Sequence, residues 1–252
     1  MCILCIDKKI NSVSQLPNNS LRRTLLKSAG LLSVGGLMSS AGIAIAQTAN
    51  PPKSNNVLNP DQALTRLMAG NATYVKSKTL QINVDETRGA LARGQNPYAC
   101  ILSCADSRIS PELAFNEERG DLFVARVAGN FVNTDILASF EYGTAVLGAP
   151  LIMVLGHTSC GAIDASIKAY TQNASFPGHI QALTTAIAPA VREASKKAKG
   201  KDLLYAATVE NVRLNVEKLK ESNPILSERV KKGNLKIVGA IYDLPSGRVN
   251  LI

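Results

Sequence analysis

The stretch LIMVLGHTSCG, residues 151–161, decides the fold: five apolar residues run without polar alternation into a glycine, a histidine and a cysteine. An apolar run of this kind predicts a strand over residues 151–155 that is covered on both faces. Runs of the same type occupy residues 99–103, 122–127 and 235–242. The sequence therefore predicts an α/β fold with a mainly parallel β-sheet core flanked by helices.

Helical patterns connect these strands. They cover residues 134–147, 160–170, 180–198 and 203–221, with an interruption expected near Pro189. Ahead of the first strand, Asn59-Pro60-Asp61 supplies an N-cap, a proline at the first helical position and an acid in the first turn, which predicts a helix to about Lys76. At the other end, the turn sequence at 243–247 predicts a hairpin that returns residues 248–252 as a final strand.

Composition narrows the class of protein. The 252 residues are 46% hydrophobic and 19% charged, with a mean hydropathy of +0.06, which is typical of a globular chain. Five cysteines are too few for a disulfide framework of this length. The net charge of +9 would permit binding to a polyanion, but residues 1–46 hold five basic side chains and one acidic. With the rest spread over the chain and no tryptophan, nucleic acid is not an expected partner.

The first 46 residues have the pattern of an export signal. Arg22, Arg23 and Lys27 precede an uncharged stretch at 28–46, rich in Gly, Ala, Leu and Ser, that ends in Ala-Ile-Ala. A basic region, a weakly apolar region and a small-x-small site predict a signal peptide, and the Arg pair resembles the twin-arginine type. Four glycines and four serines in the apolar region make a retained membrane anchor the less favoured alternative.

We therefore expect residues 1–46 to be a signal peptide, 47–58 a linker and 59–252 a single domain. Export to the periplasm is expected, or to the thylakoid lumen in a photosynthetic bacterium, with no stable membrane insertion once the signal is cleaved.

Two of the predicted strands end in residues that point to metal chemistry. The first runs into Cys104, Asp106 and Arg108, and the third into His157 and Cys160. Because the carboxyl ends of parallel strands meet at one edge of a sheet, both segments are expected to converge. Two thiols and an imidazole suit zinc, and three protein ligands leave a fourth position for water, as in catalytic zinc sites. His157 and Cys160 alone would also fit a helix start without metal, but packing explains Asp106 poorly, because a carboxylate beside an apolar strand needs a partner.

The motifs C-x-D-x-R at 104–108 and H-x-x-C-G at 157–161 together resemble those of β-class carbonic anhydrases. The resemblance spans residues 59–252 and includes FVARVAGN at 123–130 and IVGAIYDLPSGRV at 237–249. It implies zinc ligands at Cys104, His157 and Cys160, a catalytic pair at Asp106 and Arg108, and a substrate cleft lined by Gln95, Phe123, Tyr142 and Gly161. Ala162 stands where the family commonly has a second glycine.

The implied function is an exported, zinc-dependent carbonic anhydrase, a carbonate dehydratase that interconverts CO2 and bicarbonate. Zn2+ lowers the pKa of its bound water to about 7, which supplies a zinc-bound hydroxide at neutral pH. Asp106 would orient that hydroxide, Arg108 would keep the carboxylate ionised, and Gln95 would donate to the oxygen where charge develops. In a closed variant of the family Asp106 would instead be a fourth zinc ligand; the cleft residues favour the open one.

In the family the cleft lies at a dimer interface, so a homodimer or a higher even homo-oligomer is expected. Two other functions stay open: a carbonyl sulfide or carbon disulfide hydrolase on the same fold, and a non-catalytic secreted zinc-binding protein, which would not need Asp106 and Arg108. His179, the other histidine, is expected to be a solvent-exposed loop residue in preference to a proton shuttle. Cys100 is expected to be a small buried residue of the first strand.

Overall fold

The computed structural model describes residues 52–77 and 84–252. The predicted signal peptide and the first residues of the predicted linker lie outside these ranges. Within the part of the chain that is described, no helix combines the length and the apolar character needed to cross a membrane.

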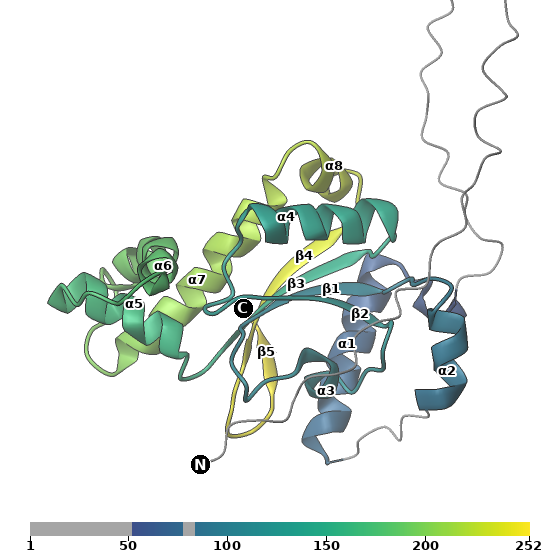
Figure 1. Cartoon of the computed structure of the whole chain (residues 1–252), viewed down its shortest axis with the longest axis horizontal. Helices are drawn as coiled ribbons and strands as arrows, with labels where there is room; N and C mark the ends of the chain where they lie inside the picture. The colour runs from purple at the N-terminus through teal and green to yellow at the C-terminus, as the bar shows by residue number, and fades with distance from the viewer. Residues whose placement is uncertain (1–51, 78–83) are drawn as a thin grey trace, which may run out of the picture. The chain divides into compact units, whose positions relative to one another are not determined.

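A five-stranded sheet forms the centre of the described chain (Figure 1). Its strands are β1 (Ala99–Ser103), β2 (Leu122–Arg126), β3 (Leu151–His157), β4 (Lys236–Tyr242) and β5 (Val249–Leu251), in the order β2-β1-β3-β4-β5. The first four strands are parallel, and β5 pairs antiparallel with β4. The predicted mainly parallel α/β fold and the final hairpin strand are thereby confirmed.

Strand β3 is two residues longer than predicted. Gly156 and His157 pair with Ile241 and Tyr242 of β4, so the ladder continues beyond the apolar run. The consequence for the site is that His157 belongs to the sheet itself and not to the loop that follows it.

The strands are connected by α-helices and two shorter turns. They are η2 (Ser54–Asn56), α1 (Pro60–Val75), α2 (Val84–Leu91), α3 (Pro111–Ala114), α4 (Thr134–Glu141), η3 (Tyr142–Val146), α5 (Gly161–Gln172), α6 (Ile180–Ala194), α7 (Asp202–Lys220) and α8 (Ile225–Lys231). Helix α1 begins as predicted: Asn59 Oδ1 accepts from Gln62 N, and Gln62 Oε1 accepts from Asn59 N, both at 2.9 Å. This reciprocal pair is a capping box.

Three details of the helix prediction were wrong. Helix α6 runs through Pro189 without a break. It ends at Ala194, four residues before the predicted end at residue 198. A proline inside a helix removes one backbone hydrogen bond, but Ile187, Ala190 and Val191 are buried on both sides of it and hold α6 in place. The helix predicted over 134–147 changes at Tyr142 into the π-helical turn η3. Helices α2, α3 and α8 were not predicted because they are too short for a clear helical period.

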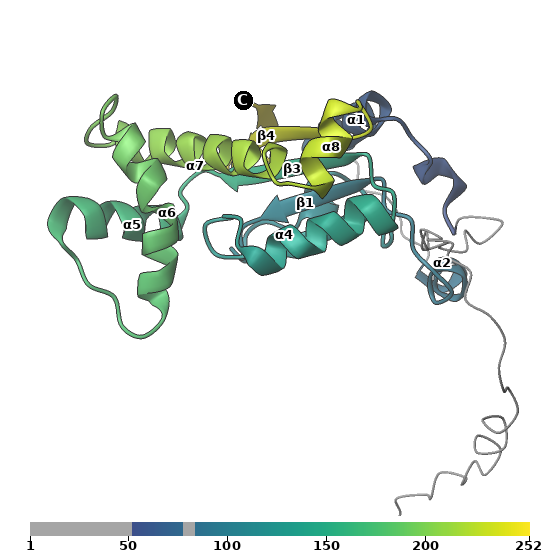
Figure 2. The ribbon, with the colours of Figure 1, turned by 90° about the horizontal axis from the view of Figure 1, so that it is seen from above.

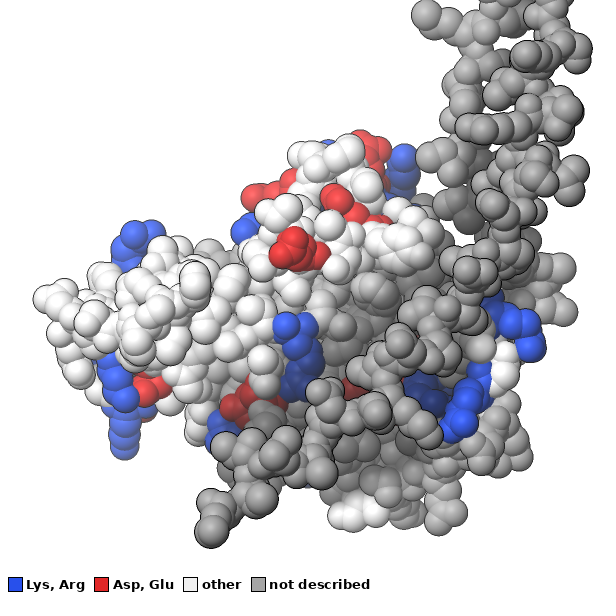
Figure 3. Space-filling model, in the orientation of Figure 1, with Lys and Arg blue, Asp and Glu red and all other residues white. Residues whose placement is uncertain are grey.

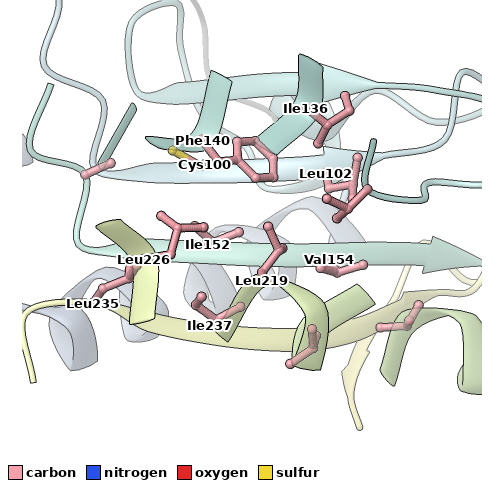
Figure 4. Packing of buried hydrophobic residues seen from close by; sticks show 14 of the residues in the cluster. Cys100, Leu102, Ile136, Phe140, Ile152, Val154, Leu219, Leu226, Leu235 and Ile237 are labelled. Carbon is pink, nitrogen blue, oxygen red and sulfur yellow. The ribbon is translucent and has the colours of Figure 1, made fainter. Parts of the chain in front are cut away.

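Helices cover both faces of the sheet. On one face, α4, α7 and α8 pack over Cys100 and Leu102 of β1 and Ile152 and Val154 of β3 (Figure 4). On the other face, α1 and α3 pack over the alternate residues of the same strands, including Ile101. Every residue of β1 and β3 is buried, which explains why neither strand shows polar alternation.

Two further helical segments lie at opposite ends of the sheet. Helices α5 and α6 lie beyond the carboxyl ends of β1 and β3, where the arrowheads point, whereas α2 lies at the opposite end (Figure 2). The carboxyl end is the edge at which the sequence places the metal ligands, so α5 and α6 border that site.

Two residues in the described part of the predicted linker bind groups of the domain. Lys53 Nζ forms an ion pair with Asp121 at 2.6 Å. Asn56 is buried, and its amide donates to the carbonyls of Asn96 and Gly120. Residues 53–56 of the predicted linker are therefore bound to the domain through their polar groups.

Charged side chains form small separate groups on the face drawn in Figure 3. Acidic ones lie over α4 and α8, basic ones lie at the tip of the α5–α6 region and beside α2, and a basic group with an acidic group next to it lies near the centre of the view. The described surface on this face therefore has no continuous basic stripe of the kind that follows a nucleic-acid backbone.

Candidate metal centre

Three buried side chains meet at the carboxyl edge of the sheet. Cys104 directly follows β1, His157 ends β3, and Cys160 is the N-cap of α5. The two sulfur atoms are 4.0 Å apart, and together with a nitrogen of His157 the three potential ligand atoms lie within 4.8 Å of one another. The convergence predicted from the motifs is therefore present within one chain.

The histidine ring is oriented for metal binding. His157 Nδ1 lies 2.9 Å from the carbonyl of Thr158, so this nitrogen carries the proton and donates it. The other nitrogen, Nε2, is buried and has no hydrogen-bond partner. A buried polar atom without a partner costs free energy unless a ligand satisfies it, and a second hydrogen bond that fixes the tautomer is typical of metal-bound histidines.

The donor set fits zinc. Tetrahedral zinc with bonds of about 2.3 Å to sulfur requires two thiolates about 3.8 Å apart, close to the observed 4.0 Å. Three protein donors are one fewer than a structural zinc site has, and this is the arrangement of catalytic sites. Cys104, His157 and Cys160 are therefore the residues that would hold the metal.

The two thiols differ in acidity. The pKa of Cys104 is lowered, chiefly because Cys160 donates a hydrogen bond to its sulfur, and Gly129 N also donates to it at 3.3 Å. Sharing one proton in the same pair raises the pKa of Cys160. Since the thiolate is the form that binds metal, Cys104 is the sulfur that is ready for a cation first.

Asp106 and Arg108 form a two-point ion pair beside the cluster. Arg108 Nε and Nη2 donate to the two carboxylate oxygens at 2.9 and 2.7 Å, and Arg108 N donates to Oδ1 at 2.9 Å. These bonds hold the pKa of Asp106 well below its usual range. Asp106 Oδ2 lies 3.8 Å from His157 Nε2, so the carboxylate borders the position that the ligands surround.

Arg126 fixes the backbone of the first motif, a role that the sequence analysis missed. It ends β2, next to β1, and its Nε donates to the carbonyl of Cys104 at 2.8 Å. Its Nη2 donates to the carbonyls of Asp106 and Ile109 at 2.7 and 3.0 Å. The only sequence signal for this role was a charged residue closing an otherwise apolar strand.

Thr158 fixes the second motif in the same way. Its hydroxyl accepts from Leu244 N at 3.0 Å and lies 3.4 Å from Asp243 Oδ1, and its N donates to the carbonyl of Tyr242 at 3.0 Å. The turn after β4 therefore holds the loop that follows His157.

The predicted cleft residues do not reach the metal centre of their own chain, apart from Gly161. Gly161 is the first residue of α5, directly after Cys160. Phe123 pairs with Cys100 across β1 and β2, four residues before Cys104, a separation of about 13 Å at 3.3 Å per residue. Tyr142 is 48% exposed and lies beside Phe123, with ring centroids 6.4 Å apart.

Gln95 lies neither in the Cys-His-Cys cluster nor beside the Phe123–Tyr142 pair. It lines a cavity of about 580 Å³ with residues of α2 and with Arg119 and Gly120, none of which belongs to the Cys-His-Cys cluster. His179 is exposed at the start of α6, as predicted, and Cys100 is fully buried, as predicted.

Fold and centre together define a class: an α/β protein with three side chains that could hold a metal ion, bordered by an acid held by an arginine. Comparison with known proteins shows the family to which the chain belongs. A family profile described as "Carbonic anhydrase" matches residues 99–249. "Carbonic anhydrase 2" of Mycobacterium tuberculosis is 36% identical over 194 residues, covering 77% of this chain and 93% of the relative. "Carbonic anhydrase" of Mycolicibacterium smegmatis is 33% identical with the same coverage.

Solved structures similar to this chain are also carbonic anhydrases. The β-carbonic anhydrase CcaA is 29% identical with a TM-score of 0.60, covering 75% of this chain and 94% of that one. A second match comes from the structures of two tetrameric β-carbonic anhydrases of Sordaria macrospora. It is 22% identical with a TM-score of 0.60, and the match covers 76% of this chain and 97% of the Sordaria chain. That likeness concerns the fold alone. The chain belongs to the carbonic anhydrase family, in its β class.

Proposed function

We propose that this protein catalyses the reversible hydration of CO2 to bicarbonate at a zinc ion held by Cys104, His157 and Cys160. By family it is a carbonate dehydratase, a lyase. One observation supports the zinc assignment above the others: His157 Nε2 is buried without a hydrogen-bond partner and faces two thiols whose sulfur atoms are 4.0 Å apart.

Zinc in this site supplies a Lewis acid that makes water a nucleophile at neutral pH. The chain's own residues then have separate tasks. Asp106 stays ionised because Arg108 donates to both of its oxygens, so it can accept a hydrogen bond at the reacting position and fix the direction of attack. Arg108 is fixed in turn, since its Nη2 also donates to the carbonyl of Ser159 at 3.1 Å.

The Asp106–Arg108 pair also favours the open form of the site. In a closed form Asp106 would bind the metal and Arg108 would lose its partner. The pair as it stands has three hydrogen bonds between the two residues, counting the backbone N–H of Arg108, and these oppose that exchange.

The active unit is a homodimer or a higher even homo-oligomer. Gln95, Phe123 and Tyr142 lie at a distance from the metal centre of their own chain, and Tyr142 is half exposed together with Val146 in η3. A second copy would cover this apolar surface and could bring these three side chains to the metal centre of its neighbour. Phe123 and Tyr142 would then form an apolar wall for CO2, and Gln95 would donate to the oxygen where charge develops.

Stopped-flow CO2 hydration tests the reaction. The zinc-loaded chain is compared with the Asp106→Asn variant, and zinc content is measured in the same samples. We expect rapid hydration by the wild-type chain and a fall of about 10²–10³ in kcat for the variant with zinc retained. A wild-type chain with stoichiometric zinc and no hydration would refute the proposal.

Export is a separate part of the proposal. It rests on Arg22-Arg23, the uncharged stretch that follows and the Ala44-Ile45-Ala46 site, all outside the described residues. Replacing both arginines by lysine should retain the full-length chain in the cytoplasm, whereas the wild-type chain should be found outside it with Gln47 at its N-terminus. An equal distribution of the two chains between the compartments would contradict the twin-arginine assignment.

A further inference from the structure

Helix α7 places two buried asparagines against the loop that joins β2 to α4. Asn211 and Asn215 are 2% and 7% exposed and lie one turn apart on the same side of the helix. Asparagine is a poor residue for a helix interior, and a buried amide costs free energy unless its polar groups are bonded. Two such residues in succession therefore call for partners outside the helix.

The partners outside the helix are backbone groups of the loop, and the Nδ2 of Asn215 bonds within the helix. Asn211 Nδ2 donates to the carbonyl of Gly129 at 2.9 Å, and Asn215 Oδ1 accepts from Val132 N at 2.7 Å. Asn215 Nδ2 donates to the carbonyl of Asn211 at 2.8 Å, and Lys218 Nζ donates to the carbonyl of Val132 at 2.8 Å. Three residues on one side of α7 thus hold the loop in one position.

The same loop contacts a proposed metal ligand. Gly129 N donates to Cys104 Sγ at 3.3 Å, so this glycine is bonded to α7 through its carbonyl and to the sulfur through its N–H. Its φ is +82°, and a Cβ there would lie 2.4 Å from Ile187 Cδ1 and 3.3 Å from Ala162 Cβ. Ala162 of α5 and Ile187 of α6 therefore pack against the glycine, and the bond to Asn211 holds the peptide group that follows it.

We propose that Asn211, supported by Asn215, is a positioning residue that aims the Gly129 N–H at the sulfur of Cys104. A hydrogen bond to a thiolate withdraws negative charge from the sulfur and fixes its direction. Outer hydrogen bonds of this kind commonly change metal affinity by about 10–100-fold. The inference rests on the zinc assignment above, but it concerns the metal site and not turnover.

The test uses the full chain loaded with Co2+ or with zinc. The thiolate-to-cobalt charge-transfer band reports the charge on the sulfur, and zinc release to a chelator reports how firmly the site holds its metal. Asn211→Asp keeps the size of the side chain and removes the donor to Gly129. We expect its charge-transfer band at longer wavelength and zinc release about 10-fold faster than in the wild-type chain. Lys218 is an exposed residue at the end of the same contact. Lys218→Met should shift both readouts in the same direction as Asn211→Asp, but by a smaller amount.

Asn56→Leu is the matched control. Asn56 is a buried asparagine whose amide also donates to two backbone carbonyls, those of Asn96 and Gly120, but it has no contact with the metal ligands. It should lower Tm and leave the band and the release rate at their wild-type values. The proposal is overturned if Asn211→Asp folds with an unchanged band and release rate, or if Asn56→Leu shifts both as far.

Should Asn211→Asp not fold, the same two readouts on Lys218→Met decide the matter: a shifted band with faster release supports the proposal, and unchanged values overturn it. Neither readout requires CO2 hydration, so failure of this proposal is distinguishable from failure of the proposed reaction.

Discussion

The metal centre and the predicted cleft wall are built from the two ends of the same sheet, and only one of them is complete in a single chain. Cys104, His157 and Cys160 are buried together where β1 and β3 end. Phe123 lies near the start of β2, and Tyr142 is half exposed beside it. The potential metal ligands thus meet inside one chain, whereas the proposed cleft, whose Tyr142 is half exposed at a distance from them, needs a second chain only if the proposed assembly is correct.

The largest expected effect comes from removing a sulfur. Cys104→Ser should abolish stoichiometric zinc binding and CO2 hydration together, because a hydroxyl is a far weaker ligand than the thiolate that Gly129 and Cys160 stabilise. Zinc analysis after gel filtration measures the loss, and the elution volume measures assembly. Retention of one zinc per chain would contradict the ligand assignment.

Arg108→Gln should affect the reaction without emptying the site. The pKa of Asp106 would rise toward its ordinary value, and the carboxylate would still be ionised at neutral pH, so the loss reflects orientation and not charge. We expect kcat to fall about 10–100-fold, with zinc content unchanged. Stopped-flow assays with parallel zinc analysis decide this, and an unchanged kcat would show that the ion pair is dispensable.

A smaller effect is expected at the contact beneath the cleft wall. Gly143 lies in η3 so close to β1 that a Cβ there would be 2.7 Å from Cys100 Sγ and 3.3 Å from Phe123 Cδ1. Gly143→Ala should therefore destabilise the fold by about 1–3 kcal/mol through overpacking.

The matched variant for this contact is Gly143→Ala with Cys100→Ala, which removes the sulfur and should recover part of the loss. Denaturant unfolding of both variants measures the recovery. A double variant no more stable than Gly143→Ala would mean that the close approach to Cys100 is not the cause.

The sequence could predict some parts of the fold and the site, and not others. Unbroken apolar runs such as residues 99–103 predict buried parallel strands, and parallel strands bring their carboxyl ends together, so the Cys-His-Cys cluster followed from the motifs. Arg126, Asn211 and Asn215 were not predicted, because each binds backbone groups far away in the sequence and has no local motif. The π-helical turn at Tyr142 was missed for a different reason, since five residues are too few to distinguish its period from that of an α-helix.

The most direct test of the account is subunit complementation. Asp106→Asn damages the metal side of the site, and Gln95→Leu, an exposed substitution, removes the hydrogen-bond donor of the predicted cleft. When the two variants are unfolded, mixed in equal amounts and refolded with zinc, a mixed dimer would hold one site with both sides intact. We predict that CO2 hydration by the mixture rises to about a quarter of the wild-type value, because half of the dimers are mixed and each has one intact site. A mixture no more active than the average of its two parents would contradict the claim that each cleft is built from two chains.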